Sequence, residues 1–291
     1  STLLVVYIGS NEVIAGRLTV GNIAEFIMYV FMLTWPVTAL GWTSSQIQRA
    51  AASQKRINEF LEAKSELTPG KQIRQDIVGN WEFKDVSFVY PGSDRPVLEK
   101  INLTIKAGES VTLLGQTGSG KSTVALLMAR FYDPSSGEIL LDGIPLKDWD
   151  IAWVRSFVGF VPQDVFLFST SISDNIRFGN DQLDQEAIET AAKQADVYAN
   201  IMEFPDRFET ILGERGITLS GGQKQRVSIA RALAKNPKML ILDDCLSAVD
   251  THTEHTILEN LKQVTKGKSS LIISHRVSSA RLANRIFVLA E

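Results

Sequence analysis

The stretch GQTGSGKST, from Gly115 to Thr123, decides the fold of this chain. It matches the pattern G-x-x-x-x-G-K-[ST], with the apolar run SVTLL before it and a helical pattern after it. Glycines let a backbone wrap closely around phosphate groups, and the N–H groups at the start of a helix bind anions. Lys121 adds a positive charge for the outer phosphates, and Ser122 supplies a hydroxyl to Mg²⁺. The motif predicts a phosphate-binding loop in an α/β nucleotide-binding fold, with these candidate nucleotide ligands: Gly115, Gln116, Thr117, Gly118, Ser119, Gly120, Lys121, Ser122 and Thr123.

A second apolar run, MLILD from Met239, ends in two acids. A phosphate-binding loop needs a carboxylate to organise its metal, and a buried strand that ends in an acid usually supplies it. We expect Asp243 to hold Mg²⁺ through its water shell. We expect Asp244 to orient the attacking water or to take its proton. The alternative, that both acids only cap a following helix, is weakened by the nearby phosphate loop.

A third motif is LSGGQ, from Leu219 to Gln223, followed by the helical pattern KQRVSIARAL. Two glycines and a serine at the start of a helix predict a second anion-binding N-terminus. Taken alone, the tripeptide SGG is a common linker sequence, so this motif gains weight only beside the other two.

The region around these motifs alternates short apolar runs with turn signals. Strands are predicted in WEFKDVSFVY, VLEKINLTIKAG, SVTLLG and EILLDG, and a helix is predicted from Ser122 to Phe131. Mostly helical patterns run from Asp184 to Ala234. The runs at Met239 and Ser270 are apolar throughout, as expected for strands of a parallel sheet that is covered on both faces.

The N-terminal part of the chain contains a long, nearly uncharged apolar run. The run IAEFIMYVFMLTWPVTALGW, Ile23 to Trp42, has twenty residues and one charge, Glu25, which is the length that a helix needs to cross a bilayer. It predicts a membrane span with a kink at Pro36, and the alternative is a buried helix of a soluble core. The helix is predicted to continue into water and to stop near Thr68-Pro69-Gly70.

Composition narrows the function further. The chain of 291 residues has 30 Lys and Arg against 33 Asp and Glu, so it lacks the basic excess of a protein that grips nucleic acid. Its one cysteine, Cys245, excludes a disulfide framework and a cysteine-built zinc site, and fits a reducing, cytosol-facing location. Because the chain starts at Ser1 and has no charged leader, we expect a fragment or processed product rather than a secretory precursor. Cys245 is expected to be a buried packing residue, and the basic residues of Lys224 to Arg231 to form the exposed side of a helix.

From Trp81 to Glu291 the sequence resembles the ATP-binding-cassette (ABC) family. The motifs stand in the family's order, with the phosphate loop as Walker A, LSGGQ as the signature and MLILDD as Walker B. The resemblance implies a P-loop NTPase fold with a mainly parallel core sheet, an antiparallel β subdomain and a helical subdomain, preceded here by an α-helical membrane segment. It implies ATP and Mg²⁺ as cofactors. It also implies a D-loop at Ser247, Ala248 and Asp250.

The resemblance assigns roles to single residues. Tyr90 would stack on adenine, Gln163 would ligate Mg²⁺ or the attacking water, and His275 would donate to a γ-phosphate oxygen. The implied catalytic set is Asp244, His275, Gln163 and Lys121, and the implied metal set is Ser122, Gln163 and Asp243. Two cassettes of this family dimerise head to tail, so the signature residues would serve the partner's ATP: Leu219, Ser220, Gly221, Gly222 and Gln223.

Three segments resemble the exporter branch of the family. These are TILGERG before the signature, PQDVFLFSTSISDNI around Gln163, and RAAASQKRINEFLE, which is similar to the end of the last membrane helix of fused exporters. We therefore expect residues 1–68 to be the end of a transmembrane domain, 69–80 a linker, and 81–291 a nucleotide-binding domain with a helical subdomain at about 163–234. The implied protein is an ATPase half of a multidrug- or lipid-type exporter.

The resemblance also implies a location and partners. We expect a multi-pass protein of the plasma (inner) membrane with its cassette on the cytoplasmic side, contacts with membrane lipid, a second half-transporter as homo- or heterodimer partner, and no nucleic acid. The alternatives are an importer cassette, which usually lies on a separate chain, and a soluble ABC ATPase that acts on nucleic acid or ribosomes, which the apolar span disfavours. A regulatory subunit that hardly hydrolyses ATP is a further alternative.

One residue departs from the family pattern. Most members follow the Walker B Asp with Glu, whereas this chain has Asp244, which is one methylene shorter. The carboxylate is drawn back by roughly 1.5 Å, and a misplacement near 1 Å can cost about a hundredfold in rate. We therefore expect slow hydrolysis at this site, as in heterodimers with one degenerate site, although a homodimer with a relaxed but active site stays open.

Overall fold

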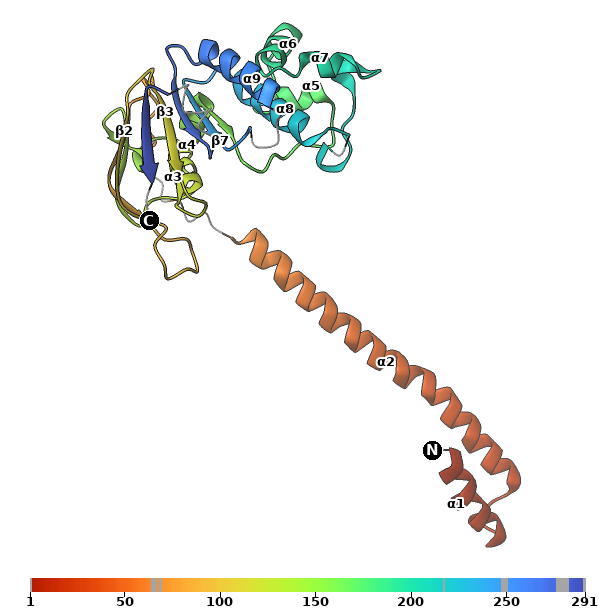
Figure 1. Cartoon of the computed structure of the whole chain (residues 1–291). Helices are drawn as coiled ribbons and strands as arrows, with labels where there is room; N and C mark the ends of the chain where they lie inside the picture. The colour runs from red at the N-terminus through yellow and green to blue at the C-terminus, as the bar shows by residue number, and fades with distance from the viewer. Residues whose placement is uncertain are drawn as a thin grey trace. The chain divides into compact units, whose positions relative to one another are not determined.

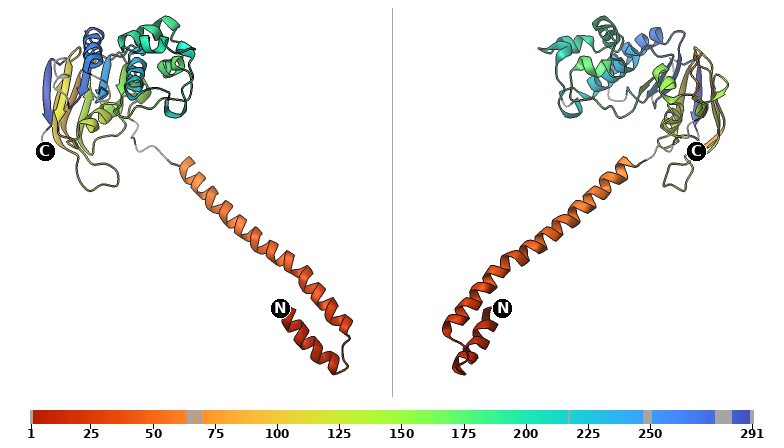
Figure 2. Two further views of the ribbon diagram at one scale, coloured as in Figure 1. Left: turned by 45° about the vertical axis from the view of Figure 1, so that its right-hand side comes forward. Right: turned by 180° about the vertical axis from the view of Figure 1, so that it is seen from behind.

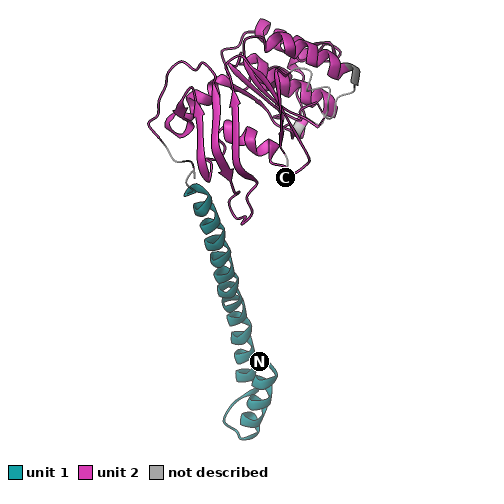
Figure 3. Cartoon of the chain, turned by 60° about the vertical axis from the view of Figure 1, so that its left-hand side comes forward, with its two compact units in different colours: residues 1–65 teal, residues 66–291 magenta. Residues whose placement is uncertain are grey.

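The computed structural model describes residues 2–63, 67, 70–216, 218–246, 251–275 and 283–289, and of Arg215, Thr251 and His252 only the backbone. By their internal contacts the residues form two compact units, Ser1–Ser65 and Glu66–Glu291 (Figure 3).

The first unit is a pair of helices, α1 (Thr2–Ile14) and α2 (Val20–Leu61) (Figure 1). They approach closely at Gly9, where a Cβ atom would lie 2.8 Å from Cγ1 of Ile23. Thr19 caps α2, since its side chain accepts the N–H of Asn22 and its own N–H donates to the Asn22 amide oxygen at 2.9 Å. Among the described residues, α2 is the one helix that is long and apolar enough to cross a membrane. The predicted span lies within it, and it ends at Leu61, before the predicted stop at 68–70.

The second unit contains an antiparallel sheet. Its strands are β1 (Trp81–Phe88), β2 (Leu98–Ile105), β4 (Ser136–Leu141) and β5 (Ile144–Pro145), in the order β2-β1-β4-β5. Phe83 of β1 lies opposite Leu103 on one side and Ile139 on the other, and all three side chains are buried. The strands predicted around residues 81, 98 and 138 are confirmed.

The other sheet is parallel throughout. Its strands are β6 (Val158–Val161), β7 (Met239–Asp243), β8 (Ser269–Ile273), β3 (Ser110–Gly115) and β9 (Arg285–Leu289), in the order β6-β7-β8-β3-β9. The predicted strands at 110, 239 and 270 are confirmed, and every residue of β7 and β8 is buried. Sequence reasoning missed β6, because it has only four residues and follows a helix without a turn signal.

Helix α3 (Lys121–Met128) packs in one core with residues of both sheets, among them Val124, Leu127, Phe83 of β1 and Val111 of β3. It ends before the predicted Phe131. Arg130 takes a left-handed backbone conformation (φ 50°), which stops an α-helix.

The remaining helices mostly surround a second core on the β6 and β7 side of the parallel sheet. Figures 1 and 2 show α5 to α8 gathered on the side of the cassette away from the antiparallel sheet. The predicted helical character of 184–234 is confirmed in segments separated by short 3-10 turns. The bounds are α4 (Ile151–Phe157), α5 (Ile172–Arg177), α6 (Gln185–Gln194), α7 (Tyr198–Met202), α8 (Gly221–Ala234), α9 (Thr251–Val264) and the 3-10 turns Leu146–Asp148, Arg207–Glu209 and Glu214–Gly216.

Residues 70–80, expected to be a linker, are fastened to the cassette, and we call this segment the strap. Asp142, at the turn after β4, accepts the backbone N–H groups of Val78 at 2.7 Å and Asn80 at 2.8 Å. Arg74 donates to Asp150 at 2.7 Å, and Ile77 is buried. The strap is therefore a packed part of the second unit rather than a free tether.

Candidate nucleotide-binding site

The candidate site lies where four neighbouring parallel strands end. Because β6, β7, β8 and β3 are adjacent in the sheet, their carboxyl ends meet at one edge. Gln163 follows β6, Asp243 ends β7, His275 follows β8, and the phosphate loop follows β3. The sheet order thus brings together motifs that are far apart in the sequence.

Glycine is required at two positions of the loop. Gly120 has a left-handed backbone (φ 88°), and a Cβ there would lie 2.6 Å from Cδ2 of Leu98. A Cβ at Gly115 would lie 2.6 Å from the carbonyl oxygen of Leu289. The loop therefore packs against β2 and β9, which keeps its backbone close to the sheet and its open side toward the cavity.

Lys121 holds the loop from inside. Its Nζ donates to the carbonyl oxygens of Gly115 at 2.9 Å and Gln116 at 2.6 Å, and its side chain is buried. Burial lowers the pKa of Lys121, while the charges of Asp243 and Asp244 oppose that shift. The ammonium group is thus already at the loop, opposite the two acids.

Ser122 and Asp243 meet at the start of α3. The Ser122 hydroxyl donates to Oδ1 of Asp243 at 3.0 Å. Burial and the neighbouring Asp244 raise the pKa of Asp243, and Ser122, Lys121 and His275 act against this shift. A hydroxyl, a buried carboxylate and the nearby Gln163 amide are hard oxygen donors, so the residues present fit Mg²⁺.

Asp244 has an unusual backbone. It lies in the left-handed region (φ 43°), and its N–H donates to the carbonyl oxygen of Ile273 at 2.9 Å. An aspartate tolerates this conformation better than most side chains. The turn after β7 is therefore tied to β8, and it leaves Asp244 at the cavity.

Tyr90 stands at the opposite border of the site. Its hydroxyl is 3.0 Å from the hydroxyl of Thr123, and its ring packs edge-on against Phe88 and Tyr132, with centroid distances of 4.8 and 5.4 Å. The ring is thus held in place beside the phosphate loop. That it stacks on adenine remains a prediction.

A cavity of about 310 Å³ joins these residues. Sequence reasoning missed Val97, which directly precedes β2, and Ile273, which ends β8, because these apolar residues belong to no motif. The predicted residues Gly115, Gln116 and Ser119 do not line the cavity, and the carbonyl oxygens of Gly115 and Gln116 accept hydrogen bonds from Lys121. The lining comprises Tyr90, Val97, Thr117, Gly118, Gly120, Lys121, Ser122, Thr123, Gln163, Asp243, Asp244, Ile273 and His275.

The signature lies outside this cavity, since none of its five residues belongs to the lining. Ser220 caps α8, accepting the N–H of Gln223 at 3.3 Å, while Gln223 Oε1 accepts the N–H of Ser220 at 2.9 Å. Gly221 and Gly222 open the helix, and Leu219 is buried. The N-terminus of α8 is thus built and capped away from the chain's own cavity. The predicted D-loop residues Ser247, Ala248 and Asp250 lie outside the described residues.

The predicted exporter segment TILGERG lies beside the segment after Gln163. Ile211 forms a bridge with Ser171, and the N–H of Leu212 donates to the carbonyl oxygen of Thr170 at 2.9 Å. The N–H of Leu219 donates to Gly216 at 2.9 Å. These contacts connect the signature to the loop that carries Gln163.

The prediction that the basic residues of α8 form its exposed side is wrong, because Lys224, Arg226 and Arg231 are all half-buried. The guanidinium of Arg231 packs against the rings of Phe168 and Phe178 and donates to Asn175 and Phe166. Its position on the helix places it on the packed face rather than the exposed side. Cys245 is buried as predicted, and burial raises the pKa of its thiol to about 12.

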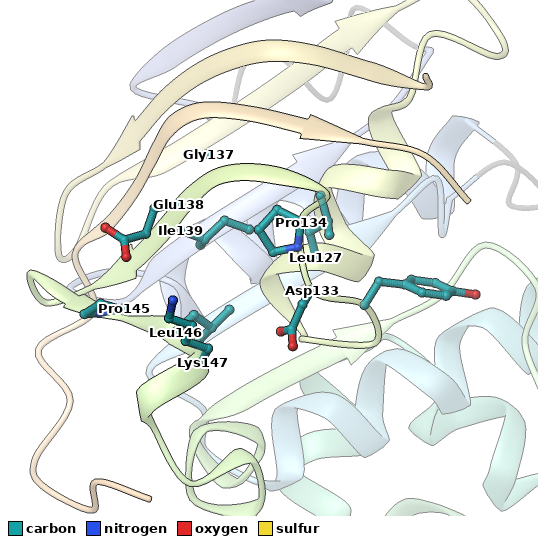
Figure 4. Close-up of a pocket in the computed structure, with 10 residues that line it drawn as sticks. Leu127, Asp133, Pro134, Gly137, Glu138, Ile139, Pro145, Leu146 and Lys147 are labelled. Atoms are coloured by element: carbon teal, nitrogen blue, oxygen red, sulfur yellow. The ribbon is translucent and has the colours of Figure 1, made fainter. Parts of the chain in front are cut away.

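A second cavity, of about 270 Å³, lies between the end of α3, the start of β4 and residues 145–147 (Figure 4). The carboxylates of Asp133 and Glu138 border it together with Lys147. None of its lining residues belongs to the predicted motifs, so the other cavity is the candidate nucleotide site.

Comparison with known proteins identifies the family of the chain. The family model described as "ABC transporter" matches residues 98–247, which span the phosphate loop, the signature and both Walker B acids. This chain belongs to the ABC transporter family.

Two relatives are named for multidrug resistance and for a lipid flippase. The chain is 40% identical over 289 residues to the multidrug resistance-like ATP-binding protein MdlA of Escherichia coli, covering 99% of this chain and 49% of that protein. It is 39% identical over 288 residues to the ATP-dependent lipid A-core flippase of Escherichia coli, covering 99% and 50%. A solved structure, described as a bacterial Atm1-family ABC exporter with ATP bound, matches with a TM-score of 0.78 at 35% identity, covering 94% of this chain and 48% of that one.

The predicted family and fold class of this ABC transporter chain are therefore confirmed. ATP is the nucleotide of this family, generally with Mg²⁺, and the family implies ATP hydrolysis. The chain spans about half the length of these relatives.

Proposed function

We propose that this chain is the ATP-binding and ATP-hydrolysing part of an exporter half-transporter. The observation that supports it best is the single cavity that brings together Lys121, Asp243, Asp244, Gln163 and His275, with the signature outside it. Within the ABC family, this arrangement fits a site that is completed by a second cassette.

Each side chain has a task that its position supports. Lys121, already at the loop, would bind the outer phosphates when its contacts to Gly115 and Gln116 exchange. Ser122, Asp243 and Gln163 would hold Mg²⁺, which neutralises phosphate charge in the transition state. Asp244 would orient the attacking water, and His275 would donate to the γ-phosphate.

We propose that hydrolysis at this site is slow. Asp244 is one methylene shorter than the usual Glu, and the hydrogen bond from its N–H to Ile273 keeps the backbone from advancing to compensate. A water-orienting group about 1 Å short of its best position can lose roughly a hundredfold in rate.

We propose that two cassettes pair head to tail in a homo- or heterodimer. The capped N-terminus of α8, with Ser220, Gly221 and Gly222, would donate N–H groups to the partner's ATP. We expect the rate of hydrolysis per molecule of this chain to rise with its concentration or on addition of a second half-transporter.

We propose that α2 spans the membrane as part of a multi-pass domain, with the cassette on the cytoplasmic side and lipid around the helix. The relatives are named for multidrug resistance and for a lipid A-core flippase, which suggests amphiphilic substrates.

The deciding experiment is Mg-ATP hydrolysis by the chain in lipid bilayers, alone and mixed with the products of neighbouring genes. Hydrolysis that Lys121→Ala abolishes supports the proposal. Vigorous hydrolysis alone indicates a homodimer in which Asp244 suffices, and activity only in the mixture indicates an asymmetric heterodimer. Absence of Mg-ATP binding and hydrolysis in every mixture would refute the proposed function.

A further inference from the structure

Asn175, on α5, organises the loop that follows Gln163. Its side chain is fully buried. Its Nδ2 donates to the carbonyl oxygens of Phe168 at 3.0 Å and Ser171 at 2.9 Å, and its Oδ1 accepts the N–H of Phe168 at 2.8 Å. One amide thus satisfies several backbone groups of a loop that has no strand or helix of its own.

Arg231, on α8, forms hydrogen bonds to Asn175 and to the same loop. Its Nε donates to the carbonyl oxygen of Asn175 at 2.7 Å, its Nη2 to Asn175 Oδ1 at 2.9 Å, and its Nη1 to the carbonyl oxygen of Phe166 at 3.0 Å. The rings of Phe168 and Phe178 lie 5.8 and 5.6 Å from the guanidinium carbon. Burial lowers its pKa to about 10, so the group still carries its charge at neutral pH. A planar fork with several charge-assisted bonds fixes both distance and angle.

The N-terminal end of α8 is connected to the same loop through the residues that precede it. A Cβ at Gly216 would lie 3.1 Å from Leu167, Gly216 accepts the N–H of Leu219, and Ile211 bridges to Ser171. Arg231 follows Gly221 by about 15 Å along the helix axis. Since an α-helix is stiff over that length, α8 is held against the loop at both ends.

We propose that Arg231 and Asn175 are positioning residues that lock the Gln163 loop to α8, so that the loop at the chain's own nucleotide and the signature at the partner's nucleotide move as one body. The functional consequence rests on the function proposed above. Neither side chain lines the nucleotide cavity, so both act through Gln163 and the signature.

The test uses Arg231→Lys, which keeps the charge and removes the fork. The matched control is Arg155→Lys on α4. Arg155 also donates from a fork to two backbone carbonyls, Ala129 at 3.1 Å and Arg130 at 2.8 Å, beneath the ring of Phe131. It contacts α3 rather than the Gln163 loop. Asn175→Ser removes the Oδ1 atom that Arg231 and Phe168 share, and provides a second break of the lock.

Hydrogen–deuterium exchange without nucleotide measures directly whether the Gln163 loop and the signature are held together. We expect Arg231→Lys and Asn175→Ser to speed exchange by about tenfold or more both in 163–171 and in 219–223. Arg155→Lys should speed exchange only near α3 and α4. Faster exchange that stops at the loop and leaves 219–223 as in the wild type would overturn the proposal.

The rate of ATP hydrolysis tests whether these contacts matter for function. The melting temperatures of both variants are measured first, so that kcat is compared at a temperature where both are folded. Arg231→Lys should then have a kcat about tenfold or more below that of Arg155→Lys, with little change in affinity for ATP. An equal kcat in the two variants would overturn the proposal. If the wild-type chain and its mixtures neither bind nor hydrolyse Mg-ATP, the proposed function fails, and the exchange measurement alone tests the link between the Gln163 loop and α8.

Discussion

The hydroxyl of Ser122 donates to Oδ1 of Asp243 at 3.0 Å, although the two residues are 121 positions apart in the chain. One begins the helix after β3 and the other ends β7. Two oxygen donors suited to Mg²⁺ thus meet directly at the edge of the sheet. The metal end of the site is assembled by the fold itself, which lowers the cost of ordering it on binding.

Ser122→Ala removes one of these donors. We expect the Mg²⁺ concentration for half-maximal hydrolysis to rise by about tenfold or more, because a charge-assisted oxygen contact is worth roughly 1.5–3 kcal/mol. Nucleotide affinity in EDTA should stay close to the wild type. Ser122→Thr keeps the hydroxyl and is the control. An identical Mg²⁺ dependence for the two variants would contradict the role assigned to Ser122.

Lys121→Ala removes the ammonium group of the loop. ATP affinity should fall by about tenfold to a hundredfold, because one charge-assisted contact to phosphate is lost along with the loop's internal bonds. Titration with a fluorescent ATP analogue measures this. Lys262→Ala, at an exposed position of α9, controls for the loss of a positive charge. Unchanged affinity in Lys121→Ala would remove this cavity as the nucleotide site.

Asp244→Glu extends the carboxylate by one methylene. Turnover should rise by about tenfold or more at nearly constant nucleotide affinity, because only the position of the water-orienting group changes. Steady-state kinetics with separate kcat and KM values test this. Asp244→Asn should abolish the remaining rate, and an unchanged rate in that variant would show that Asp244 takes no part in hydrolysis.

Asp142→Ala releases the strap. Three backbone N–H groups, those of Val78, Gly79 and Asn80, lose a carboxylate acceptor. We expect unfolding of the cassette to become easier by about 2–3 kcal/mol, as measured by urea denaturation. Asp142→Asn keeps an acceptor and tolerates the left-handed backbone (φ 52°), so it should lose less. Equal losses in the two variants would argue against the acceptor role.

Asp150 makes part of the stability dependent on pH. The backbone N–H of Trp153 and the Arg74 guanidinium hold the pKa of the Asp150 carboxyl below its ordinary value. The stability it contributes is therefore present above the unfolded carboxyl pKa, about 3.9, and is lost as pH falls through the folded value.

The Asp150→Asn variant isolates this effect, because Asn caps α4 about as well as Asp. Its stability should fall below that of the wild type at neutral pH, and the difference should vanish in acid. Urea denaturation over a range of pH measures it. Asp184→Asn, at the N-cap of α6, is the control for losing a charge at a helix start. A difference that is independent of pH would rule out the ionised carboxylate as its source.

Much of the site could be predicted from the sequence because its chemistry depends on local backbone form. The loop from Gly115 to Thr123 specifies a strand, a turn that needs glycine and a helix within a few residues. The segment MLILDD likewise predicts a buried strand that ends in acids. Patterns of this kind need no knowledge of distant contacts, so the α/β fold, the metal candidates Ser122 and Asp243 and the apolar helix α2 were predicted from neighbouring residues, whereas Gln163 was predicted from the family resemblance.

Tertiary structure decided what depends on residues that are distant in the sequence. The order β6-β7-β8-β3 sets Gln163, Asp243 and His275 side by side, and no local pattern encodes which strands are neighbours. The strap reads as a linker because its partners, Asp142 and Asp150, lie far along the chain. Arg231 reads as an exposed basic residue for the same reason. It is half-buried because the fold places aromatic rings and the Asn175 amide against it, and the exposure of a side chain depends on packing rather than on sequence spacing.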